Sequence, residues 1–312
     1  MELNLPNGRL RIGTRGSRLA RVQAEEFCRL LIGRFDVEPA ALEIVTVRTT
    51  GDAVQDRPLY EIGGKGLFVR ELDDALLAGK IDVAVHSMKD RPGHTVSGIR
   101  TCCYLKREDV RDTLVSMSHA TLGSMPEGSR IGTSSPRRRS QIMAMRPDLE
   151  IVAFRGNVET RLRKLGIGDA DATILAMAGL RRLDLVEYAT APFDPGEMLP
   201  ALCQGAIGID AREDDCELVE SLSSATDPAT AARMMAERAF LESLGGSCRS
   251  AIAGLAELTD SEIRLRCEIL HPSGWSRIQG EINGPSEGAG QLGVELADRL
   301  RSDPRADQWL KG

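Results

Sequence analysis

The spacing of hydrophobic residues predicts alternating strands and helices over roughly the first hundred residues. Short apolar strands are expected at residues 10–13, 42–47 and 81–85. A helix with Ser17 as its N-cap is expected after the first strand, because these apolar residues share one helical face: Leu19, Val22, Phe27, Leu30 and Leu31. A second helix is marked by Phe68, Leu72, Ala75 and Leu76. This order is typical of an α/β domain.

A second region repeats the same pattern of strands and helices. Strands are expected at residues 130–132, 150–153 and 172–176, with helices beginning after Ser135, Gly156 and Ala178. An apolar strand pattern at residues 199–210 then indicates that the chain returns to the first region. The repetition predicts two similar α/β lobes.

The last part of the chain predicts a smaller α+β domain. A helix over about residues 228–244 ends at Gly245 and Gly246, which is a typical C-terminal signal. Alternating strands at residues 251–256, 263–270 and 275–282 precede a final helix at about 291–300. We expect domain 1 at residues 1–104 with 201–226, domain 2 at 105–200 and domain 3 at 227–312.

The composition argues against membrane, secreted and nucleic-acid-binding proteins. The 312 residues are 42% hydrophobic and 28% charged, with no apolar run near the ~20 residues that a membrane span needs. The first residues have neither the basic start nor the apolar stretch of a signal peptide, so we expect a cytoplasmic protein that does not enter a membrane. A net charge of -6 argues against nucleic-acid binding.

The cysteines predict free thiols. There are seven, an odd number, and they are scattered without the Cys-x-x-Cys spacing of many metal and redox sites. Four scattered histidines also offer no metal-ligand pattern, so no metal is expected.

An arginine-rich turn follows the strand at residues 130–132. Ser135 and Pro136 predict a helix start, and arginines occupy positions 137–139 directly after it. Positive charge at a helix N-terminus costs about 0.3–1 kcal/mol for each residue, so an anion is expected there. A solvated basic turn is the alternative interpretation.

Arginines recur at other strand-to-helix turns. Arg15 lies close to Ser17 and Arg18 at one such turn, and residues 155–157 form another, with Arg161 one helical turn further along. Arg181 and Arg182 lie at a further turn of this kind. Because guanidinium groups pair well with carboxylates or phosphates, these turns indicate a ligand with several anionic groups.

A catalytic carboxylate is suggested at Asp90. The strand at residues 81–85 leads directly into His86, Ser87, Met88, Lys89 and Asp90, at the strand end where ligands bind in open parallel sheets. A fixed anion there would stabilise a cationic intermediate. The alternatives are that Asp90 only begins a turn and that His86 is structural.

Two glycine-containing loops remain. The loop at residues 63–66 lacks the spacing of a nucleotide phosphate loop, and we interpret it as a lid. Cys248 follows Gly245, Gly246 and Ser247 and precedes Arg249, which leaves room at its sulfur and favours the thiolate. A purely structural cysteine is the alternative.

Together these segments resemble the porphobilinogen deaminase, or hydroxymethylbilane synthase, family over nearly the whole chain. The segments that carry the resemblance, in order, are residues 12–17, 63–68, 86–90, 132–135, 155–158 and the loop around Cys248. The resemblance implies two lobes like those of type II periplasmic binding proteins, with a small C-terminal α+β domain that carries the cysteine. It also implies a monomer.

The resemblance further implies a transferase of tetrapyrrole biosynthesis. In that family a cysteine, here Cys248, forms a thioether to a dipyrromethane cofactor. Four porphobilinogen molecules are deaminated and joined to this primer, and hydrolysis releases hydroxymethylbilane. The carboxylates of the growing chain would be the anions that the arginine turns require.

The family's functional residues map onto this sequence. Asp90 and Lys89 match catalytic positions, and Lys65 matches the lid. The cofactor-binding positions are Cys248, Lys89, Asp90, Ser87, Thr133, Ser135, Arg137, Arg138, Arg155 and Gly156. The substrate-binding positions are Arg15, Ser17, Gln23, Phe68, Arg155, Arg161, Arg182 and Gln204.

The sequence departs from the family pattern at several positions. Cys203 replaces a glycine that could adopt a positive φ, which puts the placement of Gln204 in doubt and adds a second candidate thiol. Arg18, Pro136 and Ala251 replace a proline, a leucine and a proline, respectively. Two alternatives stay open: a two-lobed anion-binding module, and an inactive relative of the enzyme.

Overall fold

A computed structural model describes residues 3, 5–49, 69–94, 96–245 and 250–311. The chain forms two compact units. Of the described residues, the first unit comprises 3, 5–49, 69–94, 96–108 and 206–231, and the second comprises 109–205, 232–245 and 250–311.

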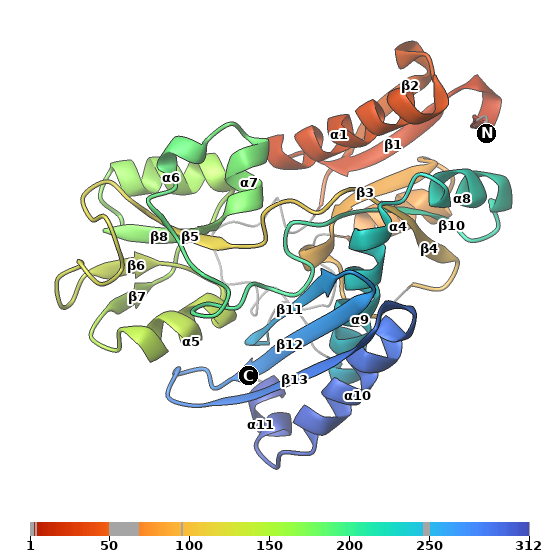
Figure 1. The fold of residues 1–312 in the computed structure, drawn as a ribbon. Coiled ribbons are helices and arrows are strands. Elements are labelled where there is room, and N and C mark those ends of the chain that lie inside the picture. Colours follow the sequence, from red (N-terminus) through yellow and green to blue (C-terminus); the bar gives the residue numbers. More distant parts are fainter. Residues whose placement is uncertain (1–2, 4, 50–68, 95, 246–249, 312) are drawn as a thin grey trace. The chain divides into compact units, whose positions relative to one another are not determined.

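The first unit is built on a five-stranded sheet (Figure 1). In spatial order the strands are β2 (Leu42–Val47), β1 (Leu10–Arg15), β3 (Val83–Ser87), β10 (Ile207–Arg212) and β4 (Ile99–Tyr104). The first three are parallel to one another, whereas β10 is antiparallel to β3 and β4. The carboxyl ends of β1 and β3 therefore lie next to each other at one edge of the sheet.

Helices cover both faces of this sheet. Helix α1 (Arg18–Phe35) and helix α8 (Cys216–Ser223) pack on one face, and α4 (Arg70–Leu77) packs on the other. Ser17 caps α1 by accepting a hydrogen bond from the Ala20 backbone N–H, which confirms the predicted helix start. Short 3₁₀ turns are η1 (Pro6–Gly8), η2 (Pro39–Ala41) and η3 (Met88–Asp90).

The second unit contains a sheet with the same arrangement. Its strands, in spatial order, are β7 (Glu150–Val152), β6 (Arg130–Gly132), β8 (Ala172–Ala176), β5 (Asp112–Ser116) and β9 (Ala191–Pro192). As in the first sheet, three parallel strands are followed by one antiparallel strand and then an edge strand. The prediction of two similar α/β lobes is confirmed.

The helices of this lobe also lie on both faces of its sheet. Helix α5 (Pro136–Met145) contributes to one hydrophobic cluster, while α6 (Val158–Gly166) and α7 (Met177–Arg182) contribute to another. A short turn, η4 (Val186–Tyr188), precedes β9.

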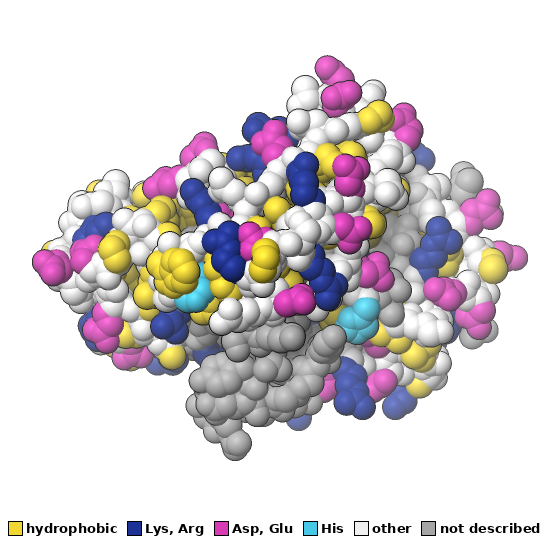
Figure 2. All heavy atoms as spheres, turned by 90° about the horizontal axis from the view of Figure 1, so that it is seen from below, with side chains coloured by type: hydrophobic (Ala, Val, Ile, Leu, Met, Phe, Trp, Pro, Cys, Tyr) yellow, Lys and Arg dark blue, Asp and Glu magenta, His cyan; other side chains and the backbone are white. Residues whose placement is uncertain are grey.

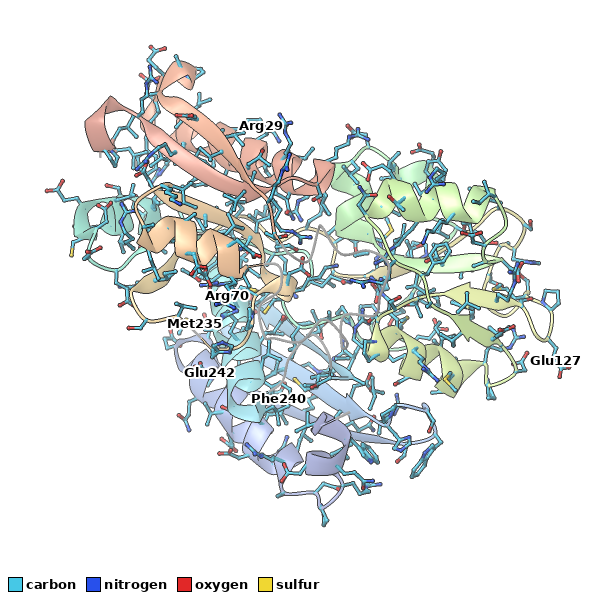
Figure 3. The ribbon with its side chains drawn as sticks, turned by 180° about the vertical axis from the view of Figure 1, so that it is seen from behind. Arg29, Arg70, Glu127, Met235, Phe240 and Glu242 are labelled. Atoms are coloured by element: carbon cyan, nitrogen blue, oxygen red, sulfur yellow. The ribbon has the colours of Figure 1, made fainter. Side chains whose placement is uncertain are left out.

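The C-terminal part of the second unit is a three-stranded antiparallel sheet with helices, the first of which begins at residue 228, within the last segment of the first unit. The strands are β11 (Ile252–Thr259), β12 (Glu262–Leu270) and β13 (Arg277–Pro285), and the helical elements are α9 (Pro228–Leu244), η5 (Ser286–Gly288), α10 (Ala289–Arg301) and α11 (Ala306–Lys311). Figure 3 labels Met235, Phe240 and Glu242 on α9, and Phe240 is fully buried. Gly245 ends α9 with φ +63°, as the glycine signal predicted. The predicted fold class is confirmed.

The predicted strand at residues 199–210 begins later than expected. It starts only at Ile207, because Cys203 and Gly205 have φ values of +62° and +87°, which an extended strand does not allow. The two units do not separate residues 105–200 from 227–312, and the boundaries of the three expected domains stay a prediction.

Surface charge is mixed in sign. Figure 2 shows Lys and Arg side chains interspersed with Asp and Glu over the described residues of the face in view. Within the described ranges, no helix is long and apolar enough to cross a membrane.

Candidate functional site

The edge of the first sheet brings Arg15 and Asp90 together. Arg15 is the last residue of β1, and Asp90 ends the η3 turn that directly follows β3. The Arg15 Nη1 atom lies 3.3 Å from Asp90 Oδ2, with side-chain exposures of 21% and 36%, respectively. The guanidinium therefore restrains a carboxylate that solvent, and a ligand, can still reach.

The η3 turn is anchored by its central buried residue. The Met88 N–H donates to the Ala206 carbonyl at 3.0 Å, and the Met88 side chain is fully buried. Its neighbours Ser87, Lys89 and Asp90 are only half-buried. The buried Met88 anchors the turn to the core, and the polar side chains on either side of it remain partly exposed at the sheet edge.

The arginine-rich turn of the second unit is explained in part by an internal anion. Ser135 caps α5 as predicted, by accepting a hydrogen bond from the Arg138 N–H. Arg137 Nη2 and Arg138 Nη2 each lie 2.7 Å from a different oxygen of Asp112, and all three side chains are buried. The anion expected at this turn is therefore present within the protein itself, as Asp112, and cofactor binding by Arg137 and Arg138 stays a prediction.

Asp112 is the centre of this buried network. Burial alone would raise its pKa, but attraction to Arg137 and Arg138 outweighs burial and holds the pKa well below the ordinary range. Gln204, which is also fully buried, donates from Nε2 to Asp112 Oδ1 at 3.0 Å and to the Val110 carbonyl at 2.8 Å. Contact of Gln204 with substrate stays a prediction that these internal partners do not support.

The turn before α6 is suited to an anionic ligand. Gly156 has φ +121°, and a Cβ there would lie 2.5 Å from Thr160 Cγ2, so the position requires glycine. Asn157 caps the helix, and the Gly156 carbonyl accepts a hydrogen bond from Arg161 Nε at 2.9 Å. Among the described residues, the buried Nη1 of Arg155 has no hydrogen-bond partner. That guanidinium has donor capacity for a carboxylate.

The remaining predicted site residues lie near helix ends, on the buried side of a helix, or outside the described residues. The expectation that Arg182 lies at a strand-to-helix turn was wrong, because Arg182 is the last residue of α7; its Nη2 atom donates to the Gly205 carbonyl at 3.1 Å. Ser17 and Thr133 do lie at strand-to-helix turns. Gln23 lies on the buried side of α1. Lys65, Phe68 and Cys248 lie outside the described residues.

Cys203 is buried in a constrained environment. Its exposed fraction is 0%, and its backbone N–H donates to Glu237. The positive φ anticipated for a glycine at this position is present even though the residue is cysteine. Burial makes this thiol unsuitable for modification in the folded protein.

Sequence analysis did not identify the buried acids that pair with buried arginines. Asp112 in the second unit and Asp73 and Asp210 in the first are all paired with buried arginines. The available signal was weak: each is an acidic residue within an otherwise apolar strand or helix face.

The two sheets of matching strand arrangement and the small C-terminal sheet define a class, the two-lobed α/β proteins with an added C-terminal domain. The porphobilinogen deaminase family provides two matching models: its "dipyromethane cofactor binding domain" matches residues 10–220, and its "C-terminal domain" matches residues 231–302. The chain belongs to the porphobilinogen deaminase family.

Two porphobilinogen deaminases agree with this assignment over more than nine-tenths of their length. The chain is 51% identical over 302 residues to the porphobilinogen deaminase of Paracoccus denitrificans, covering 97% of this chain and 96% of that protein. It is 45% identical over 290 residues to the porphobilinogen deaminase of Nitrobacter winogradskyi, covering 93% and 92%, respectively. The methionine-binding protein MetQ is similar over 70% of this chain and 90% of its own, at 13% identity and a TM-score of 0.45.

Proposed function

We propose that this protein is a hydroxymethylbilane synthase that deaminates four porphobilinogen molecules and joins them to a dipyrromethane primer on Cys248. The Arg15–Asp90 pair at the carboxyl edge of the first sheet carries this proposal, because it presents a fixed and accessible carboxylate. Membership of the porphobilinogen deaminase family supplies the reaction class. The alternatives of a binding module and an inactive relative have no support from the family assignment.

The described residues fit a dipyrromethane group. Its side-chain carboxylates require cationic and N–H donors, and the Arg155 Nη1 atom is buried without a hydrogen-bond partner among the described residues. The other proposed binding groups are Ser87, Lys89, Thr133, Ser135 and the Gly156 backbone. Arg137 and Arg138, which are paired with Asp112, would contribute mainly by holding this network in place. When bound, the primer supplies the pyrrole carbon to which porphobilinogen is joined.

Asp90 would act on the positive charge that develops as ammonia leaves the substrate. A carboxylate already fixed at the reacting position stabilises that charge without reorganisation during the step. Arg15 Nη1, at 3.3 Å, restrains Asp90 and at the same time lies where a substrate carboxylate can bind. Lys89, the preceding residue in the turn, would assist as a hydrogen-bond donor.

Substrate carboxylates would be held by arginines on helices α6 and α7. Arg161 Nε and Arg182 Nη2 each donate to a backbone carbonyl, which fixes the orientation of the guanidinium group. Ser17 would add a hydroxyl, while Phe68 and Lys65 retain their proposed places beside the substrate and on the lid. We also propose that the protein works as a monomer in the cytoplasm.

Incubation of the purified protein with porphobilinogen tests this function. We expect the protein to release ammonia and to form one hydroxymethylbilane for every four porphobilinogens consumed. Trapping of the product and mass spectrometry measure this ratio. Porphobilinogen that remains unconsumed by a folded protein would overturn the proposal.

A further inference from the structure

A buried cluster of charged and polar side chains lies directly behind the η3 turn. This cluster, called here the Arg91 cluster, consists of Asp73, His86, Arg91, Thr101 and Asp210. Asp73 belongs to α4, the helix that begins at Arg70, which Figure 3 labels. The other four residues come from β3, the residue after η3, β4 and β10.

Arg91 bridges the two carboxylates of this cluster. Its Nη1 atom lies 2.7 and 2.9 Å from the two oxygens of Asp73, and its Nε atom lies 2.8 Å from Asp210 Oδ2. Asp210 Oδ1 also accepts a hydrogen bond from Thr101 Oγ1 at 2.5 Å. Arg91 is 4% exposed, so water screens these contacts little.

The cluster contains two acidic and two basic side chains. Two carboxylates face one guanidinium, and His86 Nε2 lies 3.4 Å from Asp210 Oδ2. Ligand atoms of Asp73, His86 and Asp210 all lie within 4.8 Å of one another, but the Arg91 guanidinium provides the cation between the carboxylates. Burial raises the pKa of Asp73 to about 6; attraction to Arg91 opposes this rise, and Asp210 and the exposed Asp74 add to it.

Arg91 is covalently next to the proposed catalytic carboxylate. Its backbone N–H donates to the Met88 carbonyl at 3.2 Å, which closes the η3 turn. The side chain of Asp90 points to the accessible edge while that of Arg91 is locked in the core. Buried ion pairs are often no more stabilising than apolar residues of similar size, so stability alone does not account for this cluster.

We infer that Arg91, clamped by Asp73 and Asp210, is a positioning residue that fixes the backbone of Asp90 for the reaction. This inference rests on the proposed function. The clamp restrains the turn from its C-terminal side, and the Arg15 guanidinium restrains the Asp90 side chain. A displacement of about 1 Å at a reacting group can reduce a rate by about 100-fold, so a partly loosened clamp has a measurable effect.

Two variants test this role. Asp73→Asn removes one charge but keeps the size of the side chain and an acceptor oxygen, and Arg91→Lys keeps the charge but loses the fork that bridges two carboxylates. We expect each to lower kcat by roughly tenfold, with KM changed less than about twofold and the dipyrromethane adduct intact by mass. Asp74→Asn, which neutralises an exposed neighbour on α4, is the matched control and should keep normal kcat.

Thermal stability separates positioning from a structural role. A raised carboxyl pKa in the folded state means that stability is lost as pH rises through about 6, because ionised Asp73 is disfavoured by burial. Asparagine does not ionise, so Asp73→Asn does not lose stability in this way, and Arg91 keeps its ion pair with Asp210. We therefore expect its Tm above about pH 6 to be no lower than that of the wild type, although its kcat is reduced.

The pH profile gives a second, independent measurement. Protonation of Asp73 below about pH 6 weakens its hold on Arg91, so the ratio of wild-type to Asp73→Asn kcat should be largest above about pH 6 and fall towards one below it. Unchanged kcat in both variants, or a ratio that is constant from about pH 5 to about pH 8, would overturn the positioning role while the wild type still makes hydroxymethylbilane. A folded wild type that makes none would overturn the proposed function and this inference with it.

Discussion

Asp90→Asn is expected to abolish nearly all turnover, with kcat reduced by about 100-fold or more. Asparagine has nearly the same shape as aspartate, but it lacks the negative charge that would stabilise the cation formed as ammonia leaves. Asp90 is half-buried and its charged contact with Arg15 is 3.3 Å long, so the fold should survive the change. Fixed-time assays of hydroxymethylbilane formation measure turnover. Circular dichroism and intact mass on the same sample measure the fold and the attached cofactor.

Asp36→Asn provides the control for Asp90→Asn. Asp36 is exposed and has φ +53°, a conformation that asparagine readily adopts, so this variant removes one charge from the same unit without strain. It should keep full activity. If Asp90→Asn turns over normally, the catalytic role assigned to Asp90 is wrong.

Asp112→Asn is expected to destabilise the second unit by about 3–5 kcal/mol. The substitution leaves the buried guanidinium groups of Arg137 and Arg138 without the carboxylate that lies 2.7 Å from each of them. Because the pKa of Asp112 is lowered in the folded state, its contribution is present at neutral pH and is lost only as pH falls through that low value. Urea unfolding at neutral pH measures the loss.

The exposed Arg264–Glu281 pair offers a comparison for Asp112→Asn. Its atoms also lie 2.7 Å apart, but both side chains are more than a third exposed. Glu281→Gln should therefore shift the urea midpoint very little. Equal shifts for Asp112→Asn and Glu281→Gln would show that Asp112 is not the structural centre of its network.

Local sequence signals predicted much of the fold. The strands at residues 42–47, 130–132 and 172–176 have the predicted bounds, and Ser17 and Ser135 cap helices as expected. Capping and short apolar runs depend on neighbouring residues, so a single sequence contains the necessary information. Strands β4 and β5 and helix α8 were not predicted, because their place depends on pairing and packing with distant segments.

The candidate site was predicted less completely than the fold. The proximity of Arg15 and Asp90 follows from two parallel strands that end at the same edge, and this could be anticipated. The pairing of Arg137 and Arg138 with Asp112 could not, since the acid lies on a strand well before the helix that carries the arginines. Arginine turns alone do not distinguish a ligand's anion from one that the fold supplies.

The burial of Cys203 is another feature that the sequence alone does not predict. Its departure from glycine was recognised in the sequence, and the positive φ is present, but its complete burial depends on tertiary packing. Burial argues against Cys203 as the site of the proposed attachment, and Cys203→Gly is a control that suits the local backbone.

Intact-mass measurement of the purified protein tests the central proposal most directly. The wild type and Cys203→Gly should each carry a covalent adduct of dipyrromethane size, while Cys248→Ala should have the mass of the unmodified chain and no turnover. An adduct that persists in Cys248→Ala, or a folded wild type that stays unmodified after incubation with porphobilinogen, would contradict the account.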